Sequence, residues 1–240
     1  MSPELEDTLI RRYPELFRGR GKPMSQTLIG FGCDHRDGWY PLLDGLCETV
    51  TNRAKALGLV VPELVQIKEK FGGLRCYASQ IENESIFEAI TVAELVSYKI
   101  CEISGAPGRL CKHGLWFSTL APAIAGREGY ESVGEDAPPL PPLATEEVAR
   151  YLSAKWPTTI RCLPRIPGGW LDLVSTLVEW VSERTHTDPD HRVAFDALYE
   201  HEGELVVRLH QQVDADQGSI AFARAMARRT DPVSGQTAVR

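Results

Sequence analysis

The sequence lacks the features that mark membrane-spanning and secreted proteins. Its 240 residues contain no run near the roughly 18 apolar residues that a membrane span requires. The first stretch, MSPELEDTLIRRYPELF, is charged and amphipathic, and it has no apolar core followed by a cleavage site of small residues. Six scattered cysteines in a chain without an export signal are typical of reduced thiols packed in a core. We therefore expect a cytoplasmic protein that does not enter a membrane.

Patterns that mark common enzymes and nucleic-acid-binding proteins are also missing. There is no G-x-S-x-G elbow, no P-loop and no dinucleotide-binding fingerprint. The chain has 26 lysines and arginines against 33 aspartates and glutamates, and its net charge of −7 disfavours general attraction to phosphate backbones. These absences favour a protein that acts by binding and needs no cofactor, with an enzyme of another type left open as an alternative.

A proline-rich stretch divides the chain. Four prolines fall within five residues of the segment EDAPPLPPLAT. Because proline fixes its own backbone angle and lacks an N–H donor, this segment predicts an extended connector and neither a helix nor a central strand. The predicted organisation is a first module over 1–134, a connector over 135–145 and a second module over 146–240.

The segments on either side of the connector resemble each other. Trp39 and Trp170 are the second residues of GWYPLLDGLCETVTNRA and GWLDLVSTLVEWVSERT, and they lie 131 positions apart. The apolar residues of both segments recur at helical spacing. In each half, two β-prone runs around a glycine-centred turn follow, and then another helical pattern. The sequence therefore predicts an α+β fold made of two diverged copies of a helix-strand-strand-helix module in tandem.

The stretch CEISGAPGRLCKHG contains three candidate zinc ligands. Cys101, Cys111 and His113 would supply three of the four ligands that a zinc site requires. Ser104 stands where a second cysteine would complete a C-x-x-C pair, and a serine oxygen is a poor fourth ligand. Structural cysteines beside an exposed polar loop are the alternative interpretation. We expect no metal.

The order of motifs in the first half resembles that of a known family. GFGCDHRDGWYPLLDGLC, VQIKEKFGGLRCYAS and ICEISGAPG followed by WFSTL are similar to motifs of uncharacterised phage and prophage proteins. Those proteins carry a G-D-G-W helix start, a V-K-E-K-F-G-x-L-R-F-Y strand pair and a C-terminal zinc knuckle. The resemblance covers about residues 5–125 and implies no settled activity. It places the knuckle ligands at Cys101, Ser104, Ala121 and Ile124, so the knuckle is degenerate in this sequence. The alanine and isoleucine in place of ligands predict that WFSTLAPAIA packs as an apolar helix.

Three functions compete on these observations. The first is a non-enzymatic phage or prophage protein that acts stoichiometrically on a bacterial protein, as an inhibitor of a host-defence component or a toxin. It follows from the acidic balance, the missing catalytic patterns and the resemblance. The second is a protein that binds or sequesters a small ligand, such as a nucleotide signal, between its halves. The third is a nucleic-acid-binding protein that uses the basic hairpin of the first half, and the negative net charge disfavours it.

Five residues are the candidate contact residues. Lys68, Lys70 and Arg75 give the first hairpin its positive charge, and with Trp39 they are the candidate contacts for a small ligand. A solvated hairpin face is the alternative interpretation of the three cations, and packing at the helix start is the alternative for Trp39. Trp180 lies about 80° round the helix from the tryptophan that starts it, so it is either a candidate contact for a partner protein or part of the core. No catalytic residue is predicted.

Overall fold

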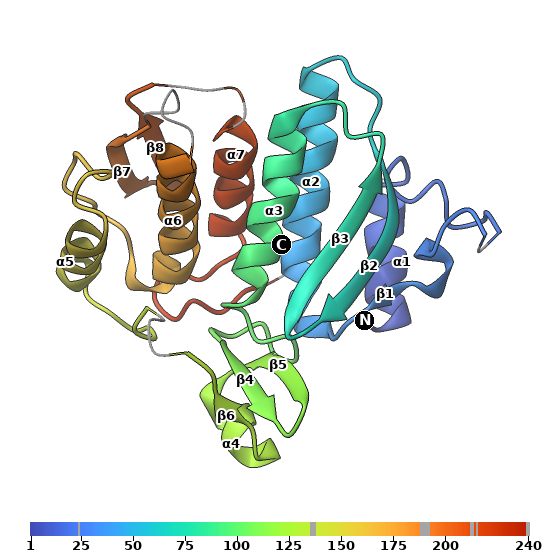
Figure 1. Ribbon diagram of the computed structural model, residues 1–240, viewed down its shortest axis with the longest axis horizontal. Helices are drawn as coiled ribbons and strands as arrows, with labels where there is room; N and C mark the ends of the chain where they lie inside the picture. Colours follow the sequence, from blue (N-terminus) through green and yellow to red (C-terminus); the bar gives the residue numbers. More distant parts are fainter. Residues whose placement is uncertain (24, 135–137, 188–192, 212–213, 215, 239–240) are drawn as a thin grey trace.

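The protein has a mixed α+β fold, as the sequence predicts (Figure 1). The computed structural model describes residues 1–23, 25–134, 138–187, 193–211, 214 and 216–238. In this part of the chain the α-helices are α1 Pro3–Arg12, α2 Tyr40–Ala56, α3 Glu84–Ser97, α4 Pro122–Glu128, α5 Thr145–Lys155, α6 Leu171–Thr187 and α7 Asp216–Ala227. The strands are β1 Cys33–Asp34, β2 Glu63–Lys70, β3 Gly73–Ser79, β4 Arg109–His113, β5 Trp116–Leu120, β6 Glu131–Ser132, β7 Phe195–His201 and β8 Glu204–Leu209.

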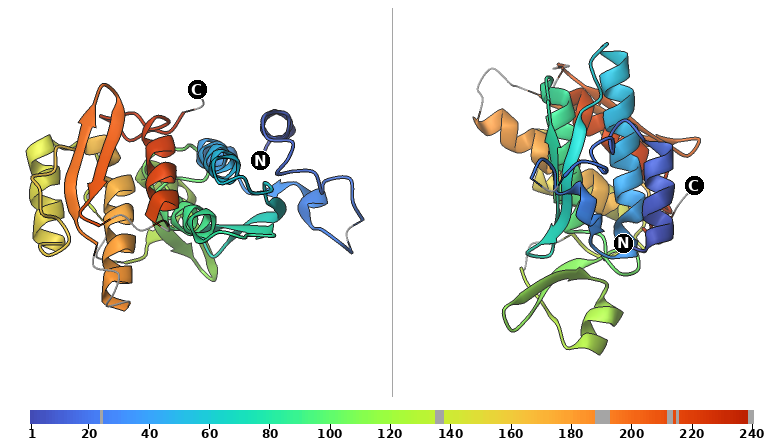
Figure 2. Two further views of the ribbon diagram at one scale, coloured as in Figure 1. Left: turned by 90° about the horizontal axis from the view of Figure 1, so that it is seen from above. Right: turned by 90° about the vertical axis from the view of Figure 1, so that its right-hand side faces the viewer.

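Four helices lie side by side across the middle of the molecule, in the order α2, α3, α7 and α6 (Figure 1). The hairpin of β2 and β3 lies on one flank of this layer and the hairpin of β7 and β8 on the other, while α1 and α5 lie at the two outer ends (Figures 1 and 2). Helix α3 packs on α7, and α2 contacts α7 while α6 contacts α3. The helices of the two halves therefore interlock.

One hydrophobic cluster runs through both halves. Trp39, Trp170 and Phe195 are among its largest fully buried side chains. Helices α3 and α7 approach closely at Gly218, since a Cβ atom built there would lie 1.6 Å from the carbonyl oxygen of Ser85. The two predicted modules therefore share one core.

Both halves anchor their long helix in the same way. Short 3-10 turns at Asp37–Trp39 and Gly168–Trp170 lead directly into α2 and α6. The indole Nε1 of the first tryptophan donates to Ile100 O at 2.8 Å, and that of the second donates to Thr230 O at 3.0 Å. A buried indole N–H needs such a partner, so each tryptophan ties the start of its helix to the chain that follows the next helix.

The two hairpins also share their register. Leu64 lies opposite Ala78 in the first hairpin, and Phe195 lies opposite Leu209 in the second, 131 positions later on both strands. Each hairpin has its irregularity immediately after this pair. In both turns the residue before the glycine has a positive φ, 53° in the first hairpin and 51° in the second. The predicted strands and turns are therefore correct in both halves.

Strands β4, β5 and β6 form a small sheet at one end of the molecule, with α4 beside it (Figure 1). A separate apolar cluster fills this part and includes Cys101 and Cys111. The sequence predicts an apolar helix across WFSTLAPAIA, and this prediction is wrong for its first half. Trp116–Leu120 is extended and pairs with β4, and α4 begins only at Pro122, where a proline in the first helical turn is well tolerated.

The predicted connector between the halves has no regular secondary structure in its described residues. Residues 138–144 contain no helix or strand, while 135–137 lie outside the described residues. Across the described ranges, none of the helices is long and apolar enough to cross a membrane.

Candidate functional site

Lys68, Lys70 and Arg75 lie together on the outer face of the hairpin formed by β2 and β3. Alternate residues of a strand point to the same side, and here Ile67 and Leu74 are turned into the core. The three cations therefore face outward, and Lys68 lies directly opposite Arg75 in the antiparallel register. The structure thus brings together the three cations that the sequence singles out.

Each of these cations lies over an aromatic ring. The pairs, from cation to ring centroid, are Lys68 with Tyr77 at 5.7 Å, Lys70 with Phe71 at 5.4 Å and Arg75 with Tyr98 at 5.7 Å. Phe71 and Tyr77 are 64% and 43% exposed, so their rings remain available to a partner. Cation–π contacts at exposed sites contribute about 0.5–1 kcal/mol each and hold the flexible cations along the sheet.

Few carboxylates neutralise this group of cations. Among the described residues, Lys68 and Lys70 make no ion pair, and Glu94 at 4.0 Å is the sole carboxylate paired with Arg75. Lys68 lies opposite Arg75 on β3 and opposite Asp34 on β1, and it makes no ion pair with that aspartate in the described chain. An anionic partner would add the carboxylates that the two lysines lack.

The group of cations and rings continues onto the small sheet. The turn between β2 and β3 contacts that sheet where Thr119 Oγ1 donates to Gly72 O at 2.7 Å. Lys112 pairs with Phe117 on the same side of the sheet as Thr119, and its Nζ lies 5.5 Å from the ring centroid. We name the whole surface the cationic-aromatic face, and its members are Lys68, Lys70, Phe71, Arg75, Tyr77, Lys112 and Phe117.

The two tryptophans predicted as contact residues lie away from this face. Trp39 is fully buried, so its ring has no surface to offer a ligand. Trp180 is half-buried against the common core, and its indole N–H donates to the carboxylate of Glu88 on α3. The structure therefore corrects both assignments, because these rings hold elements of the fold together.

The candidate zinc ligands differ in burial, although Cys111 and His113 lie on the same side of β4. Cys101 and Cys111 are buried together in the apolar cluster, whereas His113 is exposed and its ring lies edge-on to Tyr130 at 5.4 Å. Ala121 and Ile124, at places where the resemblance puts ligands, also pack in or against this cluster. No three His, Cys, Asp or Glu side chains in the described part of the chain form a group that could hold a metal ion. The expectation of no metal stays a prediction.

Burial keeps several thiols from acting as nucleophiles. It raises the pKa of Cys33 to about 12 and also raises the pKa of Cys47, Cys76, Cys111 and Cys162. Since the thiolate is the reactive form, these groups are inert at neutral pH.

A cavity of about 450 Å³ lies between the halves, lined in part by Lys99, Arg109 and Lys155. None of the four residues predicted to contact a small ligand lines it. A ligand cleft between the halves would therefore use residues that the sequence does not reveal, because they come from helix ends and strands far apart in the chain.

Comparisons of the chain with protein-family models, with curated proteins and with solved structures found no match. The fold and the geometry of these sites therefore carry the functional inference by themselves.

Proposed function

We propose that this chain is a non-enzymatic binding protein of the phage or prophage type that acts stoichiometrically on a bacterial protein, such as a host-defence component or a toxin, and inhibits it. The contact surface is the cationic-aromatic face, and the partner presents acidic side chains to it. The observation that carries the proposal is that Lys68, Lys70 and Arg75 share one outward face of the hairpin, where neither lysine makes an ion pair within the described chain. An acidic partner would supply the carboxylates that pair with these cations.

The composition of the face suits a protein interface. Aromatic residues and arginine are enriched at the centres of such interfaces, and they supply most of the binding energy there. Exposed Phe71 and Tyr77 give this face two such anchors beside Arg75. A stable interface buries roughly 800 Å² on each partner, a small part of the 11414 Å² surface of this chain.

Nucleic-acid binding by the same hairpin is the competing interpretation. Three carboxylates border the face: Glu69 accepts a hydrogen bond from Gly72 N, Glu94 lies beside Arg75, and Asp34 lies opposite Lys68. These charges and the net charge of −7 oppose any anionic partner, but they oppose a phosphate backbone, with about one negative charge per 1.7 Å of duplex axis, more strongly than a folded protein that presents a few carboxylates. The rings and cations are therefore better matched to a folded acidic surface.

We also propose that the two halves arose by duplication and that the chain descends from the family that its first half resembles. The equal offset of the two hairpin registers supports duplication. In each half, a segment also forms a parallel β-bridge with the first strand of the hairpin, and these bridges support duplication as well. Asp34 lies opposite Lys68, and Arg165 lies opposite Tyr199, again at the offset of 131. The second half carries Tyr199 and Val206 at the places of Lys68 and Arg75, so it offers a neutral counterpart of the face.

The test compares capture of a partner by the wild-type chain and by Lys68→Gln/Lys70→Gln/Arg75→Gln. Each immobilised chain is exposed to nuclease-treated bacterial lysate, and a captured protein is then purified and titrated separately against each form. We expect a complex of fixed stoichiometry in native mass spectrometry, and the triple variant should weaken it by about tenfold or more, since each tenfold loss corresponds to about 1.4 kcal/mol.

The matched control is Arg150→Gln/Arg161→Gln/Arg208→Gln, which removes the same charge from exposed positions of the second half. It should bind the partner as the wild-type chain does. Equal binding by all three forms would refute the proposed face. Capture from a parallel untreated lysate that is lost in the nuclease-treated lysate would favour nucleic acid over protein.

A further inference from the structure

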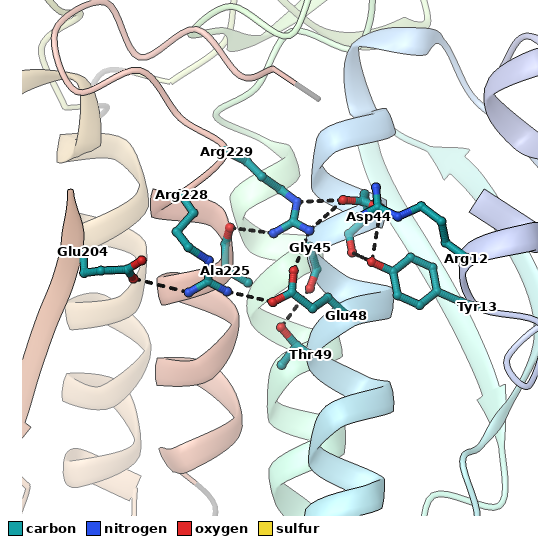
Figure 3. A network of polar contacts seen from close by, with 10 residues as sticks. All are labelled: Arg12, Tyr13, Asp44, Gly45, Glu48, Thr49, Glu204, Ala225, Arg228 and Arg229. Atoms are coloured by element: carbon teal, nitrogen blue, oxygen red, sulfur yellow. Dashed lines mark hydrogen bonds and ion pairs between the residues drawn. The ribbon is translucent and has the colours of Figure 1, made fainter. Parts of the chain in front are cut away.

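A polar network joins the two halves on one side of the helix layer (Figure 3). Asp44 of α2 is 1% exposed, and its Oδ2 accepts from Arg229 Nε at 2.9 Å and from Nη2 at 2.6 Å. Its Oδ1 lies 2.8 Å from Arg12 Nη1 and 3.2 Å from Tyr13 Oη. Glu48, one turn further along α2, accepts from the same Nη2 at 2.6 Å. The carboxylate of Asp44 therefore lies between two cations, Arg12 at the end of α1 and Arg229 just after α7.

The equivalent place on the other side is built from α5, α6 and the end of α3. Positions in α2 and α6 correspond at the offset of 131. Each site has two cations. The first follows a helix by two residues: Arg229 follows α7, and Lys99 follows α3. The second is the last residue of a helix: Arg12 ends α1, and Lys155 ends α5. The counterparts are Ser175 for Asp44, Glu179 for Glu48, Lys99 for Arg229 and Lys155 for Arg12. The cations are kept, whereas a serine replaces the central carboxylate.

This second place is the cavity of about 450 Å³ described above. Its lining includes Tyr98, Lys99, Arg109, Lys155, Ser175 and Glu179. The volume lies within the range of about 300–1,000 Å³ that is usual for small-molecule sites. The loss of a carboxylate therefore coincides with space for a ligand between the two remaining cations.

The two lysines of the cavity make no ion pair within the described chain, although the carboxylates of Asp172 and Glu179 lie near enough to act on Lys99 electrostatically. Within the described part of the chain, Lys99 Nζ makes no hydrogen bond or ion pair, and Lys155 Nζ contacts only two aromatic rings at the end of α5. Burial lowers the pKa of Lys99, because the charged amine is partly removed from water. Arg109 differs from both, since Asp172 holds it at 2.9 Å. A ligand anion would therefore be recognised by the lysines.

We propose that the cavity between α3, α5 and α6 binds a small organic anion. A carboxylate or phosphate group of the ligand occupies the place that Asp44 fills on the other side, between Lys99 and Lys155. Glu179 accepts a hydrogen bond from a hydroxyl or amino group of the same molecule. This site goes beyond the proposed function, because it uses no residue of the cationic-aromatic face.

Calorimetric titration of the full chain with inorganic phosphate, succinate and adenosine monophosphate, each at millimolar concentration, tests the site. At least one probe should bind saturably to the wild-type chain. The variant Ser175→Asp should weaken that binding by about tenfold or more, because its own carboxylate takes the place of the ligand. Without ligand, the same variant should unfold at a higher temperature, by about 2–4 °C, because Lys99 gains a partner.

A second variant, Lys99→Met, removes the cation but keeps an unbranched side chain that is one atom shorter, and it should also lose binding. Lys68→Gln/Lys70→Gln/Arg75→Gln is the matched control and should bind the probes as the wild-type chain does. Binding of succinate alone assigns the site to carboxylates, and binding of both phosphate compounds assigns it to phosphates. The proposal is overturned if no probe binds the wild-type chain, or if Ser175→Asp and Lys99→Met both leave binding unchanged.

Discussion

The exchange Asp44→Asn should weaken the contact between the two halves. The carboxylate of Asp44 is buried and holds Arg229 of the second half through two hydrogen bonds, at 2.9 and 2.6 Å (Figure 3). Arg229 is itself 6% exposed, so water does not replace a lost partner. An asparagine keeps the shape of the side chain but removes the charge that offsets the buried guanidinium.

The size of the effect follows from the remaining partners. Removing one member of a buried ion pair costs about 3–5 kcal/mol, because the other charge is left uncompensated. Glu48 still accepts from Arg229 at 2.6 Å after the exchange, so we expect the lower end of that range, about 3 kcal/mol. For a chain of this length each kcal/mol shifts Tm by roughly 2–4 °C, so Tm should fall by about 6–12 °C.

Urea denaturation and calorimetry at neutral pH measure this loss. Glu15→Gln is the matched control, since it breaks the ion pair of Lys55 and Glu15 at 2.8 Å, whose side chains are 57% and 52% exposed. Such exposed pairs contribute only about 0–1 kcal/mol. The double variant Asp44→Leu/Arg229→Met should recover most of the lost stability, because it leaves no buried charge at that contact. If Asp44→Asn and Glu15→Gln lose equal stability, the buried pair does not hold the halves together.

Two further predictions concern proton uptake and the shared core. Burial lowers the pKa of His35 from 6.5 to about 4, so the unfolded chain takes up a proton first as the pH falls. The free energy of unfolding should therefore decrease between about pH 6.5 and pH 4, and His35→Leu should flatten that slope in urea titrations; an unchanged slope would contradict this cause. Expression of residues 1–137 alone should give an unstable or dimeric product, because the faces of α2 and α3 that pack on α7 become exposed. Size-exclusion chromatography and circular dichroism check this, and a well-folded monomer would argue against the shared core.

Short-range patterns in the sequence are sufficient to predict the long helices α2 and α6 and the hairpins β2–β3 and β7–β8. Apolar residues at helical spacing marked Tyr40–Ala56 and Leu171–Thr187, and a glycine after a polar run marked each hairpin turn. The alternation of strands could also have identified Tyr77, which lies two residues beyond Arg75 on the same face. These elements are set by neighbours within a few residues of each other.

Contacts between distant residues were beyond the reach of the same patterns. Trp180 was predicted as a surface contact because its own helix does not show that Glu88, 92 positions earlier, lies beside it. WFSTLAPAIA was predicted as a helix because its apolar composition does not reveal that Trp116–Leu120 pairs with β4. The cavity was missed for a related reason, since Lys99 and Lys155 meet only when α3, α5 and α6 are packed.

The difference between Asp44 and Ser175 links stability to binding. At Asp44 the carboxylate belongs to the chain, so its ion pairs with Arg229 and Arg12 stabilise the protein whenever it is folded. At Ser175 the anion comes from the proposed ligand, so Lys99 forms a stabilising ion pair only when the cavity is occupied. A ligand at a hundredfold excess over its Kd stabilises the folded state by about 2.7 kcal/mol, which is close to the effect expected for Asp44. The proposed ligand therefore stabilises the folded chain at Ser175 as the carboxylate of Asp44 does on the other side of the helix layer. In Ser175→Asp the stability of the folded chain should no longer depend on the ligand.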